Sequence, residues 1–141
     1  MVSTIMSHQF VQEKLDVFYK SNRIPHTIFH GSSLSEKETV VMDFLKRIYQ
    51  SESDMSENVM FVNCAHGKGI RFIRDEIKFF AKTNSKPTIK FKSIVLLNGD
   101  HLTMDAQSAL RRCIEQFSHH TRFFIIAENK NKLLTPILSR F

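Results

Sequence analysis

The sequence predicts an α/β fold, in which an open parallel β-sheet of at least four strands is flanked by helices. Two observations lead to this prediction. Short segments rich in apolar, β-branched and aromatic residues alternate with longer stretches of helical periodicity, with no repeat or low-complexity tract. Such alternation is typical of parallel strands connected by helices. One short segment, SIVLLN at 93–98, is an apolar run of the kind found in strands buried on both faces.

The length and composition limit the classes of protein to which this chain can belong. A chain of 141 residues is long enough for one domain with a real core. Its 42% hydrophobic and 24% charged residues are typical of a soluble globular protein, and neither a membrane span nor a secretory leader is recognisable. Cys64 and Cys113 lack metal-ligand spacing and are interpreted as reduced core residues of an intracellular protein. The net charge of +6 favours a polyanionic partner, although many basic domains bind no nucleic acid.

The first part of the chain alternates between helix and strand. Apolar residues recur at loosely helical spacing over 6–21, and Asn22 and Pro25 end this N-terminal helix. HTIFH at 26–30 is rich in β-branched and aromatic residues and is a predicted strand. Three- and four-residue apolar steps then predict an amphipathic helix over 35–49.

The same alternation continues through the middle of the chain. SESDMSEN at 51–58 is predicted as a polar connector, and VMFVNC at 59–64 as the second strand. Gly67 and Gly69 mark a turn, after which a helix extends to about Lys82.

The last part contains two further strands. NSKPTIKFK at 84–92 is a predicted loop, and the apolar run at 93–98 is the third strand. Thr103 is a candidate N-cap for a helix that ends near Phe117. RFFIIA at 122–127 is the fourth strand.

The segment HGSSLSEKETV at 30–40 lies between a predicted strand and a predicted helix, where a phosphate-binding loop would occur. In such a loop, GxxxxGK[ST], glycines let backbone N–H groups face the phosphates, the lysine reaches the terminal phosphates and the hydroxyl holds magnesium. Gly31 and Lys37 fit the first glycine and the lysine. Glu36 and Glu38 occupy the positions of the second glycine and the hydroxyl.

These two glutamates oppose the binding of an anion, because carboxylates would themselves occupy the positive field of the helix N-terminus. Ser33 with Glu36, or Ser35 with Glu38, also fits a capping box, in which side chains satisfy the free N–H groups. The segment therefore predicts weak binding of ATP or none. An ordinary strand–turn–helix is the alternative, and this segment alone does not decide between the two.

From Ile24 onwards, the motifs resemble in order and spacing those of the small subunits of replication factor C, the AAA+ sliding-clamp loader. The most specific motif is DAQSALRR at 105–112. The resemblance is carried by four longer segments: IPHTIFHG at 24–31, VNCAHGKGIRFIRDEIKFFAK at 62–82, FKSIVLLNGDHLTMDAQSALRRCIEQFS at 91–118 and TRFFIIAENKNKLLTPILSRF at 121–141.

The resemblance implies an AAA+ P-loop-type core over 25–141, preceded by an N-terminal helix within 1–24 and truncated before the family's helical lid and collar. The acidic pair that would hold magnesium and orient the attacking water falls on Leu97 and Asn98, and neither can do so. The sensor-1 asparagine position holds Glu128, with Asn129 one place later. The degenerate nucleotide site therefore comprises Gly31, Lys37, Leu97, Asn98, Glu128 and Asn129.

The resemblance also implies roles for basic and apolar residues. Arg140, in Ser-Arg-Phe instead of the family's Ser-Arg-Cys, is a candidate arginine finger for a neighbouring subunit's ATP, or else a surface arginine. Candidate DNA contacts are Lys68, Arg71 and Arg74, on or before a helix whose wheel separates basic residues from apolar ones. Lys78 and Lys82 share that basic face but are expected to face solvent. Arg111 and Arg112 match the family's paired arginines and are candidates for bracing neighbouring subunits. Candidate contacts to the clamp are Ile114, Phe117, Ser118 and His119, with an ordinary helix C-terminus as the alternative.

The expected function is that of a clamp-loader subunit-like protein that assists the loading of a sliding clamp onto primed DNA. Its implied partners are other clamp-loader AAA+ subunits, the sliding clamp and primer–template DNA, with no membrane. It is expected inside the cell, in the nucleus or at another site of DNA replication. No metal site is expected, because adjacent histidines such as His119 and His120 point apart, and ATP with magnesium would bind only weakly. A free-standing DNA-binding or regulatory AAA+ remnant without ATPase activity is the alternative, and an active ATPase is a third.

Overall fold

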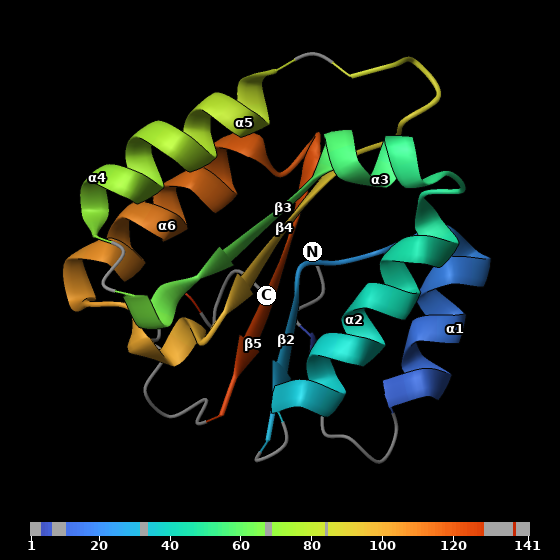
Figure 1. Ribbon diagram of the computed structural model, residues 1–141, viewed down its shortest axis with the longest axis horizontal. Coiled ribbons are helices and arrows are strands. Elements are labelled where there is room, and N and C mark those ends of the chain that lie inside the picture. The colour runs from blue at the N-terminus through green and yellow to red at the C-terminus, as the bar shows by residue number, and fades with distance from the viewer. Residues whose placement is uncertain are drawn as a thin grey trace.

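The computed structural model describes residues 4–6, 11–31, 34–66, 69–83, 85–128 and 137 of the chain. In this part, one β-sheet is covered by helices on both faces (Figure 1). The predicted α/β class is confirmed.

Five strands form the sheet: β1 (Thr4–Met6), β2 (Thr27–His30), β3 (Val59–Asn63), β4 (Lys92–Leu97) and β5 (Thr121–Ala127). All neighbouring strands pair in parallel, in the order β1-β2-β5-β4-β3. The predicted parallel sheet of at least four strands is therefore confirmed. The chain forms β1 at one edge with β2 beside it, crosses to the other edge with β3 and then fills the centre with β4 and β5.

The two central strands place alternate side chains in two separate cores. In β5, Phe123 and Ile125 pack into the core on one face, and Phe124 and Ile126 pack into the core on the other. β4 alternates in the same way, and its core-facing residues are buried on both sides. This double burial accounts for the continuous apolar runs in these strands.

One face of the sheet is covered by α1 (Val11–Ser21) and α2 (Leu34–Ile48), as Figure 1 shows. Leu15 of α1 and Phe44 of α2 lie in the same core as Phe124. The predicted helix over 35–49 is thus confirmed to within one residue at each end.

The other face is covered by two helices. The first runs without interruption from Ile70 to Lys82 and consists of α4 (Ile70–Phe72), a π-helical segment η3 (Ile73–Ile77) and α5 (Lys78–Lys82). The second is α6 (Met104–Phe117), and the Thr103 side chain accepts a hydrogen bond from the Ala106 N–H at 3.2 Å. The predicted N-cap is therefore confirmed. Two 3₁₀ turns, η2 (Cys64–His66) and η4 (Gly99–His101), follow β3 and β4.

The N-terminal segment differs from the prediction. The helix begins at Val11, and residues 4–6 form strand β1, which pairs in parallel with β2. Residues 7–10 lie outside the described part. The helical assignment is wrong for Met6, because a segment this short is decided by its pairing partner at the sheet edge and not by its own spacing pattern.

The segment at 51–58 also differs from the prediction. It forms helix α3 (Glu52–Asn58) instead of a connector. The Ser51 hydroxyl accepts a hydrogen bond from the Asp54 N–H at 3.0 Å, and Glu52 and Asp54 lie in the first turn, where carboxylates favour the helix N-terminus. The sequence of α3 has no periodic apolar face that would predict a helix. The helix is favoured instead by the cap and the carboxylates at its N-terminus.

At the amino-terminal edge of the sheet, where the parallel strands begin, the side chains of Arg122 and His26 form hydrogen bonds to the backbone of neighbouring elements. The Arg122 guanidinium donates hydrogen bonds to the carbonyl oxygens of Ile24, Ser118 and Thr121. His26 is fully buried, and its Nδ1 accepts a hydrogen bond from the backbone N–H of Phe123 at 3.0 Å. Burial, and to a smaller extent the positive charge of Arg122, lowers the pKa of His26 from 6.5 to about 4.

The low pKa of His26 predicts a loss of stability in mild acid. Between pH 6.5 and about 4 the unfolded chain binds a proton at His26 that the folded protein does not bind, so stability falls as the pH falls. The loss attributable to His26 should approach about 3 kcal/mol near pH 4 and should not increase below it. Urea unfolding at a series of pH values measures it.

His26→Asn is the control, because the amide oxygen of asparagine can accept the Phe123 hydrogen bond without titrating. The variant should show a smaller loss of stability over the same pH range. Identical pH dependence in the two proteins would contradict the assignment.

Candidate nucleotide-type site and basic helix face

The candidate nucleotide site lies at the carboxyl-terminal edge of the sheet, where the ends of parallel strands meet. The backbone N–H of Gly31, directly after β2, donates to the carbonyl oxygen of Ala127, the last residue of β5, at 3.2 Å. Leu97, the last residue of β4, pairs with Ile126 of β5. The structure thus brings the predicted positions on β2, β4 and β5 to one edge.

Lys37 folds back onto the glycine of the predicted phosphate loop. Gly31 has φ = +141°, and a Cβ atom at this residue would lie 2.7 Å from Lys37 Nζ. The Lys37 side chain is only 3% exposed. Among the described residues, no hydrogen bond or ion pair to its ammonium group is found. The backbone conformation therefore favours glycine at 31, and any larger residue there would also displace the end of the Lys37 side chain.

The glutamates at the start of α2 are exposed. Glu36 lies in the first turn of the helix, and Glu38 follows one turn above its start. Because α2 begins at Leu34, Ser35 is already helical, and the N-cap position directly before it is 33. Of the two predicted capping boxes, Ser33 with Glu36 has the matching register, although Ser33 lies outside the described residues.

The positions expected to hold magnesium have no carboxylate. Leu97 packs against the core beneath α1 and α2. Asn98 adopts the left-handed conformation, with φ 56° and ψ 46°, and its Nδ2 donates to Asn63 Oδ1 at 2.9 Å. Asn63 Oδ1 also accepts the Ala65 N–H at 3.0 Å. A neutral amide pair therefore bridges the ends of β3 and β4.

Asn63 was not among the predicted site residues. The available signal was its position: it is the polar residue that ends the apolar strand β3, and it pairs in register with Leu97 at the end of β4. Gly99 was missed as well. A Cβ atom there would lie 2.4 Å from Ile125 Cγ2, so the turn after β4 requires glycine to pack against β5.

The sensor position is described only in part. Glu128 is exposed directly after β5, whereas Asn129 and Arg140 lie outside the described residues. Within the described part, no group of three His, Cys, Asp or Glu side chains could hold a metal ion.

The helix from Ile70 to Lys82 has the two faces that its sequence predicts. Ile73 and Ile77 are buried in the core, while Arg71 and Arg74 are exposed. No ion pair of either arginine is found within the described ranges. Lys68 lies outside them. Lys82 is exposed as predicted, whereas Lys78 is half-buried.

The predicted contact surface at the end of α6 is only partly accessible. Arg112 and His119 are exposed, and Arg111, Phe117 and Ser118 are half-buried. Ile114 is 1% exposed and belongs to the core on that face of the sheet. The structure leaves almost no surface of Ile114 for a partner, because the helical face that carries it packs on the sheet.

These features define a class of protein. The sheet, its flanking helices and the loop position after β2 are those of an AAA+ domain of the P-loop type. The structure of a DNA polymerase III gamma subunit-related protein from Thermotoga maritima superposes with a TM-score of 0.73 and 20% identity, over 92% of this chain and 43% of that one.

Two sequence relatives narrow the class. Replication factor C small subunit 1 of Pyrobaculum islandicum is 34% identical over 130 residues, which are 92% of this chain and 39% of the relative. Replication factor C subunit 3 of Blastobotrys adeninivorans is 35% identical over 136 residues, which are 96% of this chain and 40% of the relative. The chain is a homologue of the replication factor C small subunits, of the clamp-loader AAA+ family.

Two further findings limit what the homology shows about this chain. The chain spans less than half the length of these relatives, and no protein-family model matches the sequence. Among the described helices, none has both the length and the apolar character that crossing a membrane requires.

Proposed function

We propose that this chain acts as a clamp-loader subunit-like protein that assists the loading of a sliding clamp onto primed DNA, with a degenerate ATP site of its own. Its partners would be other clamp-loader AAA+ subunits, the clamp and primer–template DNA, at the site of DNA replication. The homology to replication factor C small subunits over nearly the whole chain carries this proposal.

The chemistry at the carboxyl-terminal edge supports the loss of ATP hydrolysis. Magnesium takes oxygen ligands, and ATP hydrolysis needs a group that orients the attacking water. Leu97 offers no ligand, and the Asn98 amide is already bonded to Asn63. Lys37 supplies one cation near Gly31, but the carboxylates of Glu36 and Glu38 oppose a triphosphate at the same helix end.

The exposed arginines of the helix from Ile70 to Lys82 suit contacts with a DNA backbone. Arg71 and Arg74 are exposed on the side of the helix away from Ile73 and Ile77. Such contacts would neutralise phosphates, would not depend on sequence and would weaken with salt. Lys68, two residues before this helix in the sequence, is a further candidate for such contacts and lies outside the described residues.

Arg140 would act on a neighbouring subunit and not on this chain. A guanidinium placed near the γ-phosphate of a neighbour's ATP stabilises the charge that develops during phosphoryl transfer. This role needs no nucleotide in the chain's own site, so a degenerate site and a working arginine finger are compatible.

Calorimetry tests the degenerate site. Titration of ATP with magnesium into the chain should give no binding tighter than about 1 mM, because neither Leu97 nor Asn98 can hold the metal. Lys37→Met, which retains most of the buried side-chain volume, should give the same result. Magnesium-dependent binding that is tighter than this and is lost in Lys37→Met would show a working nucleotide site.

Salt-dependent binding to primed DNA tests the basic helix face. Arg71→Ala with Arg74→Ala should weaken binding for all sequences and lower the slope of log K against log salt by about 2. The matched control is Lys14→Ala with Lys46→Ala, which removes two exposed charges from α1 and α2 on the opposite side of the sheet. Equal salt slopes for the two double variants would refute the assignment.

Affinity purification and reconstitution test the assembly. The tagged chain should recover clamp-loader subunits and the clamp from its own organism. In the reconstituted assembly, Arg140→Ala should lower ATP turnover at least about twofold, because one neighbouring site loses its γ-phosphate contact. The isolated variant should unfold at the same temperature as the parent chain.

Recovery of the chain without any AAA+ or clamp partner would favour the alternative, a free-standing DNA-binding or regulatory module. Exposed Arg71 and Arg74 are compatible with that role too. Unchanged turnover in the Arg140→Ala assembly would remove the arginine finger but leave the assembly role intact.

A further inference from the structure

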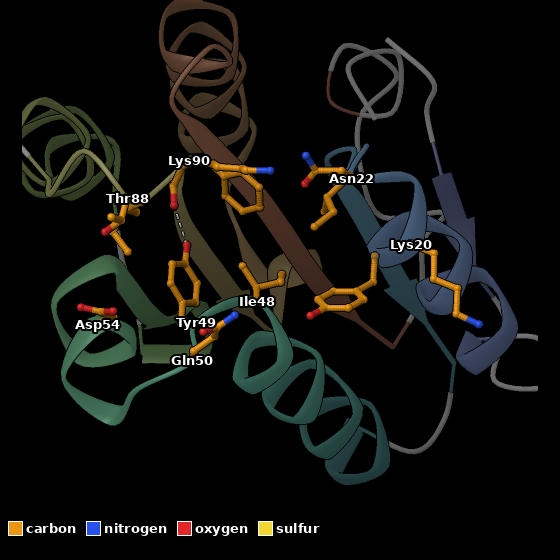
Figure 2. Close-up of a pocket in the computed structure, with 12 residues that line it drawn as sticks. Lys20, Asn22, Ile48, Tyr49, Gln50, Asp54, Thr88 and Lys90 are labelled. Atoms are coloured by element: carbon orange, nitrogen blue, oxygen red, sulfur yellow. Dashed lines mark hydrogen bonds between the residues drawn. The ribbon is translucent and has the colours of Figure 1, made fainter.

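A hollow of about 610 Å³ lies at the amino-terminal edge of the sheet, opposite the edge that carries Gly31 and Asn98. The ends of α1 and α2, helix α3 and the segment before β4 enclose it. Figure 2 shows Asn22, Ile48, Tyr49 and Lys90 around this hollow, with Lys20 directed away from it. Its apolar lining is formed mainly by Ile24, Ile48, Tyr49, Ile89 and Phe91.

A second hollow of about 320 Å³ adjoins the first, because Ile89, Lys90 and Phe91 line both. The lining of this second hollow is strongly basic and includes no acidic side chain among the described residues. Its basic members are Lys82, Lys86, Lys90, Lys92 and His120. The two hollows share this stretch of wall, and we name them together the amino-edge groove.

Two of the lysines are already engaged within the protein. Lys92 Nζ donates to the carbonyl oxygens of Phe80 and Thr83 at the end of α5. Lys86 Nζ lies 3.2 Å from Asp54 Oδ1. In the described part of the chain, the exposed side chains of Lys82 and Lys90 have no such hydrogen bond or ion pair. They are the cations that remain available to a ligand.

The charges divide the groove into two ends. The larger hollow contains Asp54 and lies beside the C-terminal ends of α1 and α2, whose carbonyl groups carry partial negative charge. Its lining is mixed, with apolar side chains beside polar ones, and its negative field disfavours an anion, so the apolar part of a ligand suits it better than a carboxylate does. The smaller hollow suits carboxylates or phosphates, because uncompensated lysines lower the cost of placing an anion there.

The aromatic rings of the groove offer little room for stacked bases. The Arg47 guanidinium lies 4.4 Å from the centroid of the Tyr19 ring, and that of Arg122 lies 5.2 Å from the centroid of Phe91. The Tyr49 hydroxyl donates to the carbonyl oxygen of Phe91 at 2.7 Å and lies 3.0 Å from Ser93 Oγ. Single-stranded nucleic acid binds through free aromatic faces along a continuous basic track, whereas these described rings are each contacted by an arginine or tied to the backbone by a hydroxyl.

We propose that the amino-edge groove binds an acidic segment of a partner protein, with apolar side chains in the larger hollow and carboxylates over Lys82 and Lys90. The larger hollow is within the size range of sites that bury several side chains or a small ligand. Electrostatic complementarity would fix the direction of the segment, since its acidic end must lie at the smaller hollow. This site is separate from the nucleotide-type edge and from Arg71 and Arg74, so it does not depend on the proposed clamp-loading role.

Fluorescence anisotropy with a synthetic peptide tests the proposal on the full chain. The probe is a labelled octapeptide of two leucines, phenylalanine, glycine and four glutamates. Two matched peptides replace either the glutamates by glutamine or the three apolar residues by serine. Each matched peptide should bind at least about tenfold more weakly than the probe, because each lacks one of the two complementary ends.

Variants locate the binding to the groove. Lys82→Glu with Lys90→Glu should weaken binding of the octapeptide at least about tenfold, whereas Lys14→Glu with Lys46→Glu, an equal charge change outside the groove, should alter it less than about twofold. Ile89→Ser tests the apolar end, and thermal melts confirm that each variant is folded. The proposal is overturned if the octapeptide fails to bind at about 1 mM or if both charge-reversal pairs weaken it equally. Tighter binding of an oligothymidylate of equal charge, lost in Lys82→Glu with Lys90→Glu, would show a nucleic-acid site in its place.

Discussion

The burial of β4 and β5 on both faces determines how the sheet, its helices and the candidate site are arranged. Their alternate side chains enter two cores, so the sheet is stable only between two helical layers. Parallel neighbours also require helical crossovers, which return the chain to the same end of the sheet each time. The loops after β2, β3, β4 and β5 therefore meet at one edge. The geometry of the candidate site is a consequence of this burial.

The two edges of the sheet use polar groups differently. At the amino-terminal edge, the polar groups of Arg122, His26 and Tyr49 are bonded to the backbone of neighbouring elements. They hold β2, β5 and the segment before β4 together. At the carboxyl-terminal edge, Lys37 is buried against Gly31 without a bonded partner among the described residues. Polar groups at the first edge mainly stabilise the fold, whereas the ammonium group of Lys37 at the second edge has no hydrogen bond or ion pair within the described ranges.

Much of the fold could be predicted, because strands that are buried on both faces have continuous apolar sequences. The run at 93–98 and the strand at 122–127 were assigned from apolar residues alone, and both are central. Strand β1 and helix α3 were not predicted. Strand β1 depends on pairing with β2, helix α3 is capped by Ser51, and neither feature produces a periodic pattern of apolar residues. In the candidate site, the sequence identifies Leu97 and Asn98 as uncharged side chains at the end of an apolar run. It could not predict that Ile114 is buried or that Asn63 bonds to Asn98, because both depend on how elements pack.

The amide pair at the carboxyl-terminal edge has a consequence for stability. Two carboxylates at the end of a strand repel each other and are favoured by a nearby cation such as a metal ion. Asn63 and Asn98 instead satisfy each other without charge, and Asn63 also accepts a backbone N–H. Asn98 further suits the left-handed backbone that starts the turn to Gly99, a conformation that asparagine tolerates better than most residues. These hydrogen bonds link the ends of β3 and β4 and stabilise this part of the sheet without a charged group.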